Sequence, residues 1–96
     1  MNKYLKIEYY PSFERKAKTQ YLEISTEGYV LRNLEQFRAG GFGAADSEGN
    51  ESNGVILPDG KITDEVICSS PDEFDTKEIS HEAFEALWKK YAVSSD

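Results

Sequence analysis

The stretch "YVLRNLEQFRAGGFGAAD", residues 29–46, holds two apolar runs on either side of a glycine pair. Gly40 and Gly41 can supply the positive φ angles that a chain needs to reverse direction between two strands. Gly43 and the two alanines after it leave room for a bulky element, such as a helix, to lie across the second run. The stretch therefore predicts a strand, a glycine turn and a second, short strand.

The first of these two runs, 29–38, does not keep a single strand phase. Leu31 and Phe37 share one parity, whereas Leu34 has the other. Either both faces of the strand are covered, or a bulge near Asn33 shifts its register. We expect a long, bent central strand.

Two earlier runs alternate between apolar and polar residues. "KYLKIEYY" (3–10) puts Leu5, Ile7 and Tyr9 on one face, and "TQYLEIST" (19–26) repeats the pattern. The links between the runs are short, which favours hairpins over crossovers. We therefore predict a four-stranded, mostly antiparallel meander that ends with "FGAAD". In an alternative, only three strands are regular, and "FGAAD" and "GVIL" (54–57) are irregular.

The strongest helical pattern is "ISHEAFEALWKKYA", residues 79–92. Ser80 is the expected N-cap, and Ile79 and Phe84 stand at the two positions of a hydrophobic staple. One apolar stripe follows the helical period, and it consists of Phe84, Leu87, Trp88 and Tyr91. The fold class predicted is α+β, with this C-terminal helix packed on one face of the sheet.

The composition is that of a single small globular domain. The chain has 96 residues, of which 39% are hydrophobic, and no apolar run approaches the ~20 residues of a membrane span. Its start lacks the apolar centre of a signal peptide. We expect one domain over 1–96 with a frayed tail at 93–96, located in the cytoplasm and not in a membrane.

Local motifs for catalysis or cofactors are incomplete. The glycine stretch has neither the third glycine of a dinucleotide fingerprint nor a phosphate-binding lysine, and it runs into a loop. The loop 46–57 lacks the glycine and the final glutamate of a calcium-binding loop. His81 is the only histidine and Cys68 the only cysteine, so neither a zinc site nor an internal disulfide is expected. We predict no catalytic, cofactor-binding or metal-binding residues and expect a protein that is not an enzyme.

The charge is uneven along the chain. The net charge is −7, and residues 59–85 alone carry nine acidic residues against two lysines. Such a segment repels nucleic acid and attracts a basic protein, although acidity can also serve solubility alone. We name four acidic residues as candidate contacts for a partner: Asp72, Glu73, Asp75 and Glu78.

Tyrosines are frequent, and some are placed where a partner could reach them. Tyr4 and Tyr10 share the face of the first strand opposite Leu5. If the helix covers the Leu5 face, Tyr4 and Tyr10 lie on the exposed side of the sheet, where Tyr21 can join them. Exposed tyrosines anchor many protein interfaces, although they also pair across strands with no partner present.

The order of these features resembles a family of small, acidic, uncharacterised bacterial domains of unknown function. The likeness spans roughly residues 4–91 and rests on a third strand with arginine and glutamate, a glycine turn, a small-residue strand and a closing helix of the form I-S-x-x-x-F-E-x-x-W. The matching positions are Arg32, Glu35, Phe37, Gly40, Ala45, Ile79, Ser80, Phe84, Glu85 and Trp88. The resemblance implies no activity. Similar small acidic proteins often neutralise toxins as immunity proteins, which is an analogy of context.

Together these features favour a non-enzymatic, protein-binding module. Its most concrete form is an immunity protein that neutralises a basic bacterial toxin. Two alternatives stay open. One is a small-molecule-binding or enzymatic domain that uses a pocket between helix and sheet, and the other is a structural homo-oligomer joined through sheet edges or the tyrosine face.

Overall fold

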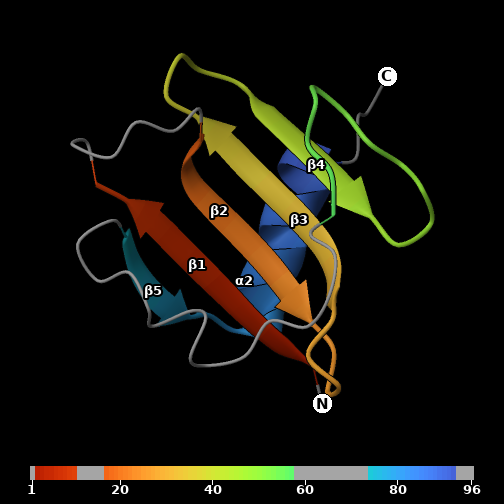
Figure 1. Cartoon of the computed structure of the whole chain (residues 1–96). Helices are drawn as coiled ribbons and strands as arrows, with labels where there is room; N and C mark the ends of the chain where they lie inside the picture. The colour runs from red at the N-terminus through yellow and green to blue at the C-terminus, as the bar shows by residue number, and fades with distance from the viewer. Residues whose placement is uncertain (1, 11–16, 58–73, 93–96) are drawn as a thin grey trace.

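The computed structural model describes residues 2–10, 17–57 and 74–92, and in this part of the chain one sheet carries one C-terminal helix on one face (Figure 1). Its elements are β1 (Lys3–Tyr9), β2 (Ala17–Ile24), β3 (Val30–Phe37), β4 (Phe42–Asp46), β5 (Phe74–Glu78), α2 (His81–Leu87) and a π-helical segment, Trp88–Ala92. The α+β class and the antiparallel sheet with a C-terminal helix are confirmed.

The sheet has five strands in the order β4-β3-β2-β1-β5, and each neighbouring pair is antiparallel. The four-strand prediction is therefore wrong by one strand. The meander β1 to β4 is as expected, but β5 returns to the far side and pairs with β1. Its sequence, "FDTKE", has no apolar alternation, so its strand conformation depends on pairing with β1 and leaves no local signal.

The phase change in the central strand comes from a bulge at Leu31. Glu23 pairs with Arg32, and the next residue of β2, Ile24, pairs with Val30, so Leu31 is the additional residue on β3. The expected irregularity exists, two residues before Asn33. A β-bulge bends a strand and redirects the side chains beside it.

The helix begins as expected, because Ser80 Oγ accepts a hydrogen bond from the backbone N–H of Ala83 at 3.0 Å. Phe84 on α2 is fully buried, and it packs in one cluster with Tyr21, Leu34 and Ala44. The last two side chains belong to β3 and β4, so Ala44 leaves the space for the helix that the sequence predicted.

The helix covers the face of β1 that carries Tyr4, not the face that carries Leu5. Tyr4 contacts Phe84 with ring centroids 5.2 Å apart, and Tyr21 is only 8% exposed. The expectation that Tyr4 and Tyr21 lie on an exposed side is therefore wrong. Both faces of the sheet carry apolar residues, so the alternation in β1 alone could not select the face that the helix covers.

The opposite face holds a second apolar cluster, made of Leu5, Ile7, Leu22, Ile24 and Val30. Beside it, the segment 50–57 folds back over β4. The buried Asn33 fixes this segment, because its side-chain amide donates a hydrogen bond to the carbonyl oxygen of Ile56 at 3.0 Å. The "GVIL" run is thus an extended anchor and not a strand.

Candidate polar cleft between helix and sheet

One row of polar side chains crosses the helix-covered face of the sheet. Tyr4 lies opposite Glu23, Glu23 lies opposite Arg32, and Arg32 lies opposite Asp46. Residues that are directly opposite on neighbouring strands point to the same face. Four strands therefore bring a phenol, two carboxylates and a guanidinium into a line.

Arg32 is the centre of this row, and all of its described hydrogen bonds go to carboxylates. Its Nε donates to Glu23 Oε1 at 2.6 Å, and its two terminal nitrogens donate to the two carboxylate oxygens of Glu85 on α2. The guanidinium carbon lies 4.8 Å from the ring centre of Phe84 and 5.1 Å from that of Trp88. Arg32 thus joins the helix to the sheet through charge and through aromatic stacking.

Further hydrogen bonds surround both carboxylates. Glu23 Oε2 accepts from the Tyr4 hydroxyl at 2.9 Å and from Asn2 Nδ2 at 3.0 Å. Glu85 Oε2 lies 3.1 Å from Nε2 of His81, one turn earlier on the helix. His81, for which the sequence predicts no role as a metal ligand, therefore contacts this network from its exposed side.

These contacts hold the network in its charged form. Burial by itself raises the pKa of Glu23, but the hydrogen bonds from Arg32, Asn2 and Tyr4 outweigh it and keep that pKa below its usual 4.5. The hydrogen bond from Arg32 likewise lowers the pKa of Glu85. Burial lowers the pKa of Arg32, but its bonds to Glu85 and Glu23 more than reverse this and raise it. These three groups keep their charges near neutral pH and are poorly suited to exchange protons there.

A cleft of about 310 Å³ opens beside this row. Its lining consists of Glu23, Leu31, Arg32, Asp46, Ser47, Glu48 and Trp88. The bulge explains why Leu31 and Arg32, which are adjacent in sequence, both line it, because in a regular strand they would point to opposite faces. Trp88 reaches it from the point where the α-helix becomes π-helical. Single π-helical turns are often found at functional sites.

A tight loop positions the acidic side of the cleft. The Asp46 carboxylate accepts hydrogen bonds from the backbone N–H groups of Glu48 and Asn50 and from the Asn50 side chain, each at 3.0 Å. The side-chain bond from Asn50 is the main reason why the pKa of Asp46 is lowered. Glu48 is exposed and has no ion pair with another residue of the described part. Since Arg32 is already shared by Glu23 and Glu85, the cleft has an excess of negative charge.

A second, shallower hollow of about 590 Å³ lies at the glycine turn. It is lined by Phe37, Gly40, Gly41, Phe42, Asn53 and Gly54. None of these residues carries a charge or a nucleophile. Gly40 and Gly41 have φ angles of 102° and 88°, which confirms that they make the turn.

The predicted contact residues that the structure describes do not gather in one exposed patch. Asp72 and Glu73 lie outside the described residues. Asp75 and Glu78 are exposed on β5 but, being three residues apart on a strand, point to opposite faces. Tyr10 follows β1 and is half-buried, and its carbonyl oxygen accepts a hydrogen bond from Arg38 at 2.8 Å.

Sequence reasoning missed Glu23 and Asp46 as partners of Arg32. Their proximity depends on strand register, which a single sequence does not reveal. A signal did exist for the helix side, because Arg32, Phe84, Glu85 and Trp88 all belong to the pattern that carried the family resemblance. The structure brings these four residues into contact.

Among the described residues, no group of three histidine, cysteine, aspartate or glutamate side chains is arranged to hold a metal ion. No helix in this part is long and apolar enough to cross a membrane.

These features define the chain as a small α+β domain, in which a partly buried arginine–carboxylate network joins one helix to the sheet beside an acidic cleft. The model of a family described as a domain of unknown function, DUF6881, matches residues 3–93. The chain belongs to this family, which confirms the resemblance. Searches of curated proteins and of solved structures gave no match.

Proposed function

We propose that this domain is a non-enzymatic, protein-binding module that receives a cationic side chain of a basic partner in the cleft beside Arg32. The observation that carries the proposal is the excess of carboxylates in a cleft that also has an indole wall. Glu23, Asp46 and Glu48 line it together with Trp88. Carboxylates with an aromatic neighbour are the usual environment for a bound ammonium or guanidinium group.

The state of Arg32 supports binding of a cation. Its hydrogen bonds to Glu23 and Glu85 occupy both of those carboxylates, so its charge is balanced locally. Asp46 and Glu48 are left to attract an incoming cation. Because Glu23, Arg32 and Glu85 keep their charges near neutral pH, the site favours recognition over proton transfer.

A bacterial toxin with a basic surface would present such cationic side chains to the cleft. An immunity protein would neutralise the toxin by covering that surface. Electrostatic attraction of this kind raises the association rate and weakens with added salt. The proposal therefore includes a salt-dependent affinity.

Binding can be tested with a hexa-arginine peptide and the fluorescence of Trp88, which is the only tryptophan in the chain. We expect a saturable change in Trp88 emission at low salt that is lost in ~0.5 M salt, where screening lengths fall to a few Å. The paired variant Asp46→Asn/Glu48→Gln should weaken binding about tenfold, because it removes two charges at the cleft.

A matched control is Glu27→Gln/Glu82→Gln, which removes two charges from exposed positions that do not line the cleft. It should leave the affinity within about twofold, because exposed charges away from the contact are screened. Equal weakening by both pairs would show that the peptide senses only net charge and would overturn the cleft as the binding site. The absence of any saturable change would do the same.

A further inference from the structure

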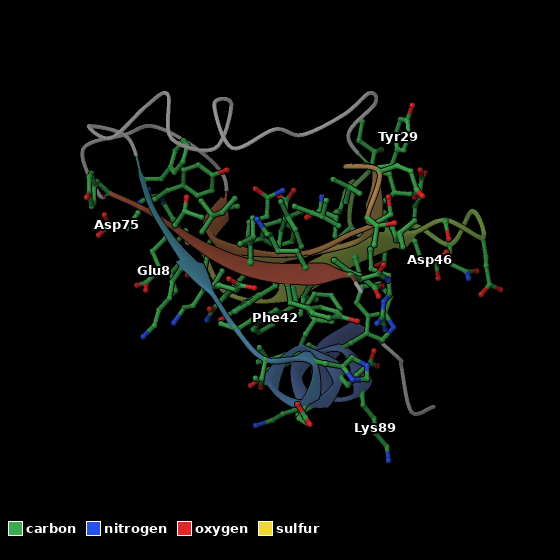
Figure 2. The ribbon with its side chains drawn as sticks, turned by 90° about the horizontal axis from the view of Figure 1, so that it is seen from below. Glu8, Tyr29, Phe42, Asp46, Asp75 and Lys89 are labelled. Atoms are coloured by element: carbon green, nitrogen blue, oxygen red, sulfur yellow. The ribbon has the colours of Figure 1, made fainter. Side chains whose placement is uncertain are left out.

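Of the two margins of the described sheet, only the one at β4 is covered by another described segment. There the backbone N–H of Ser52 donates to the carbonyl oxygen of Ala44 at 2.8 Å, and that of Asp46 donates to the carbonyl oxygen of Asn50 at 3.0 Å. At the other margin, β5 is the last of the described strands, and β1 is its only partner among them. Figure 2 shows these margins apart, with Asp75 at one side of the molecule and Asp46 at the other.

The hydrogen bonds to β1 determine which groups of β5 face outward. The backbone N–H of Ile79 donates to the carbonyl oxygen of Tyr4 at 2.9 Å, so these opposite residues form a hydrogen-bonded pair. Such pairs alternate along an antiparallel ladder. It follows that Asp75 and Lys77 bond toward β1, whereas the N–H and C=O groups of Phe74, Thr76 and Glu78 point away from it.

The charges of β5 are poorly matched to β1. Asp75 lies opposite Glu8, and Lys77 lies opposite Lys6. Like charges in directly opposite positions are destabilising. Lys6 instead pairs with Glu8 on its own strand, at 3.5 Å, and neither Asp75 nor Lys77 makes an ion pair within the described part of the chain. Figure 2 shows Glu8 and Asp75 on the same side of the molecule.

We propose that β5 pairs with β5 of a second copy, in antiparallel orientation and with the two-fold axis at Thr76. In this register Thr76 meets Thr76 of the second copy, and Phe74 meets Glu78. These are the residues whose backbone groups point outward, so each such pair can exchange hydrogen bonds. The sheets of the two copies then become one continuous sheet.

The same register resolves the charge mismatch. Asp75 lies opposite Lys77 of the second copy, and Lys77 lies opposite its Asp75. These are non-hydrogen-bonded pairs, in which the two Cα atoms are only ~4.5 Å apart and the side chains approach closely. A lysine on an edge strand usually discourages pairing with other chains. Here it favours one register of β5 with β5, because the two-fold axis at Thr76 places each of the two charges opposite a charge of the other sign.

This inference is independent of the proposed function, since the cleft lies at the other margin of the sheet. A five-residue edge buries less area than stable dimers do, so we expect a dissociation constant on the order of tens of micromolar at low salt. Sedimentation velocity between ~5 and ~500 µM should show a monomer that converts to a dimer as concentration rises.

Charge reversal provides the decisive test. Asp75→Lys places lysine opposite lysine in both pairs, and Lys77→Asp places aspartate opposite aspartate, so each should weaken the dimer about tenfold. The double variant Asp75→Lys/Lys77→Asp restores opposite charges and should recover the dimer to within about threefold of the unchanged protein. Circular dichroism of each variant establishes that it folds.

Two outcomes would overturn the proposal. One is an unchanged protein that stays monomeric at ~500 µM. The other is a double variant as impaired as the single ones, which would mean that residues 75 and 77 do not lie opposite each other across the interface. The register itself is checked by nuclear magnetic resonance in a mixture of ¹³C-labelled and unlabelled protein. We expect an intermolecular nuclear Overhauser effect between the α-protons of residues 75 and 77. Its absence from a dimer would contradict this pairing.

Discussion

Arg32 joins two carboxylates that differ in their access to water. The side chain of Glu23 is 10% exposed and that of Glu85 is 41% exposed, while Arg32 itself is 18% exposed. Exposed ion pairs contribute little because water and salt screen them, whereas breaking a buried pair leaves a charge without compensation. The bond from Arg32 to Glu23 is therefore the more important one for stability, although Glu85 receives two hydrogen bonds.

We predict that Glu23→Gln lowers the free energy of unfolding by about 1–3 kcal/mol, whereas Glu85→Gln lowers it by less than about 1 kcal/mol. Glu23 Oε2 accepts hydrogen bonds from the Tyr4 hydroxyl and from Asn2 Nδ2. In the variant, the glutamine NH₂ group would face one of these two donors. Urea denaturation of both variants measures the difference. Equal costs would contradict the ranking by exposure.

The same carboxylates predict how stability depends on pH. The pKa values of Glu23 and Glu85 are lower in the folded protein than their usual 4.5. Below about pH 5 the unfolded chain therefore binds more protons than the folded one, and stability falls as the pH decreases through the folded-state pKa values. Urea midpoints between pH 3 and 6 should show this loss, with a shallower slope in Glu23→Gln. An identical slope in this variant would exclude Glu23 as a source of the dependence.

The hairpin of β3 and β4 shows how closely the elements approach one another. A Cβ atom at Gly43 would lie 2.5 Å from Val55 Cγ2 and 2.8 Å from the carbonyl oxygen of Ser52. The sequence predicted small residues here to make room for the helix. Ala44 has that role, whereas Gly43 makes room for the segment 50–57 on the opposite face.

We expect Gly43→Ala to lower the free energy of unfolding by about 1–3 kcal/mol, because the added methyl group overpacks this site. Val55→Ala is the matched partner in a double-mutant cycle. The double variant should be less destabilised than the sum of the single ones by more than about 0.5 kcal/mol, since one of the two clashes is removed. Strict additivity would show that Val55 is not what restricts Gly43.

The sequence predicts best those elements whose conformation is indicated by a pattern in their own residues. Alternation in β1 and β2 and the cap and stripe of α2 are local patterns, and they were predicted correctly. The strand β5 was not, because "FDTKE" forms a strand only where β1 pairs with it. The polar row was not predicted either, because only the register of the paired strands brings Glu23, Arg32 and Asp46 together.

On the scale of the whole molecule, one sheet separates two apolar layers, and the Arg32 network joins the helix to that sheet. The five strands pair in this sheet, and Phe84, Leu87 and Trp88 pack against its residues. Elements that share one packed core ordinarily unfold in one cooperative step in proteins of this size. Trp88 at the network and the sheet as a whole should therefore lose structure together.

We predict that thermal unfolding followed by Trp88 fluorescence coincides with unfolding followed by far-ultraviolet circular dichroism. The reason is that Trp88 stacks against Arg32 on β3, and Arg32 in turn donates a hydrogen bond to Glu23 on β2. An earlier transition in fluorescence would mean that the helix separates from the sheet before the sheet unfolds.

The additional residue at Leu31 has a consequence for how such sequences evolve. Deletion of that one position would restore regular alternation and leave Val30 opposite Ile24 on its present face, because Leu31 is the residue without a partner on β2. Relatives that lack the residue should then keep an apolar side chain at position 30 and lose the side chain that Leu31 contributes to the cleft beside Trp88. A one-residue gap in the family, placed at this point, would therefore divide its members into those with this wall of the cleft and those without it.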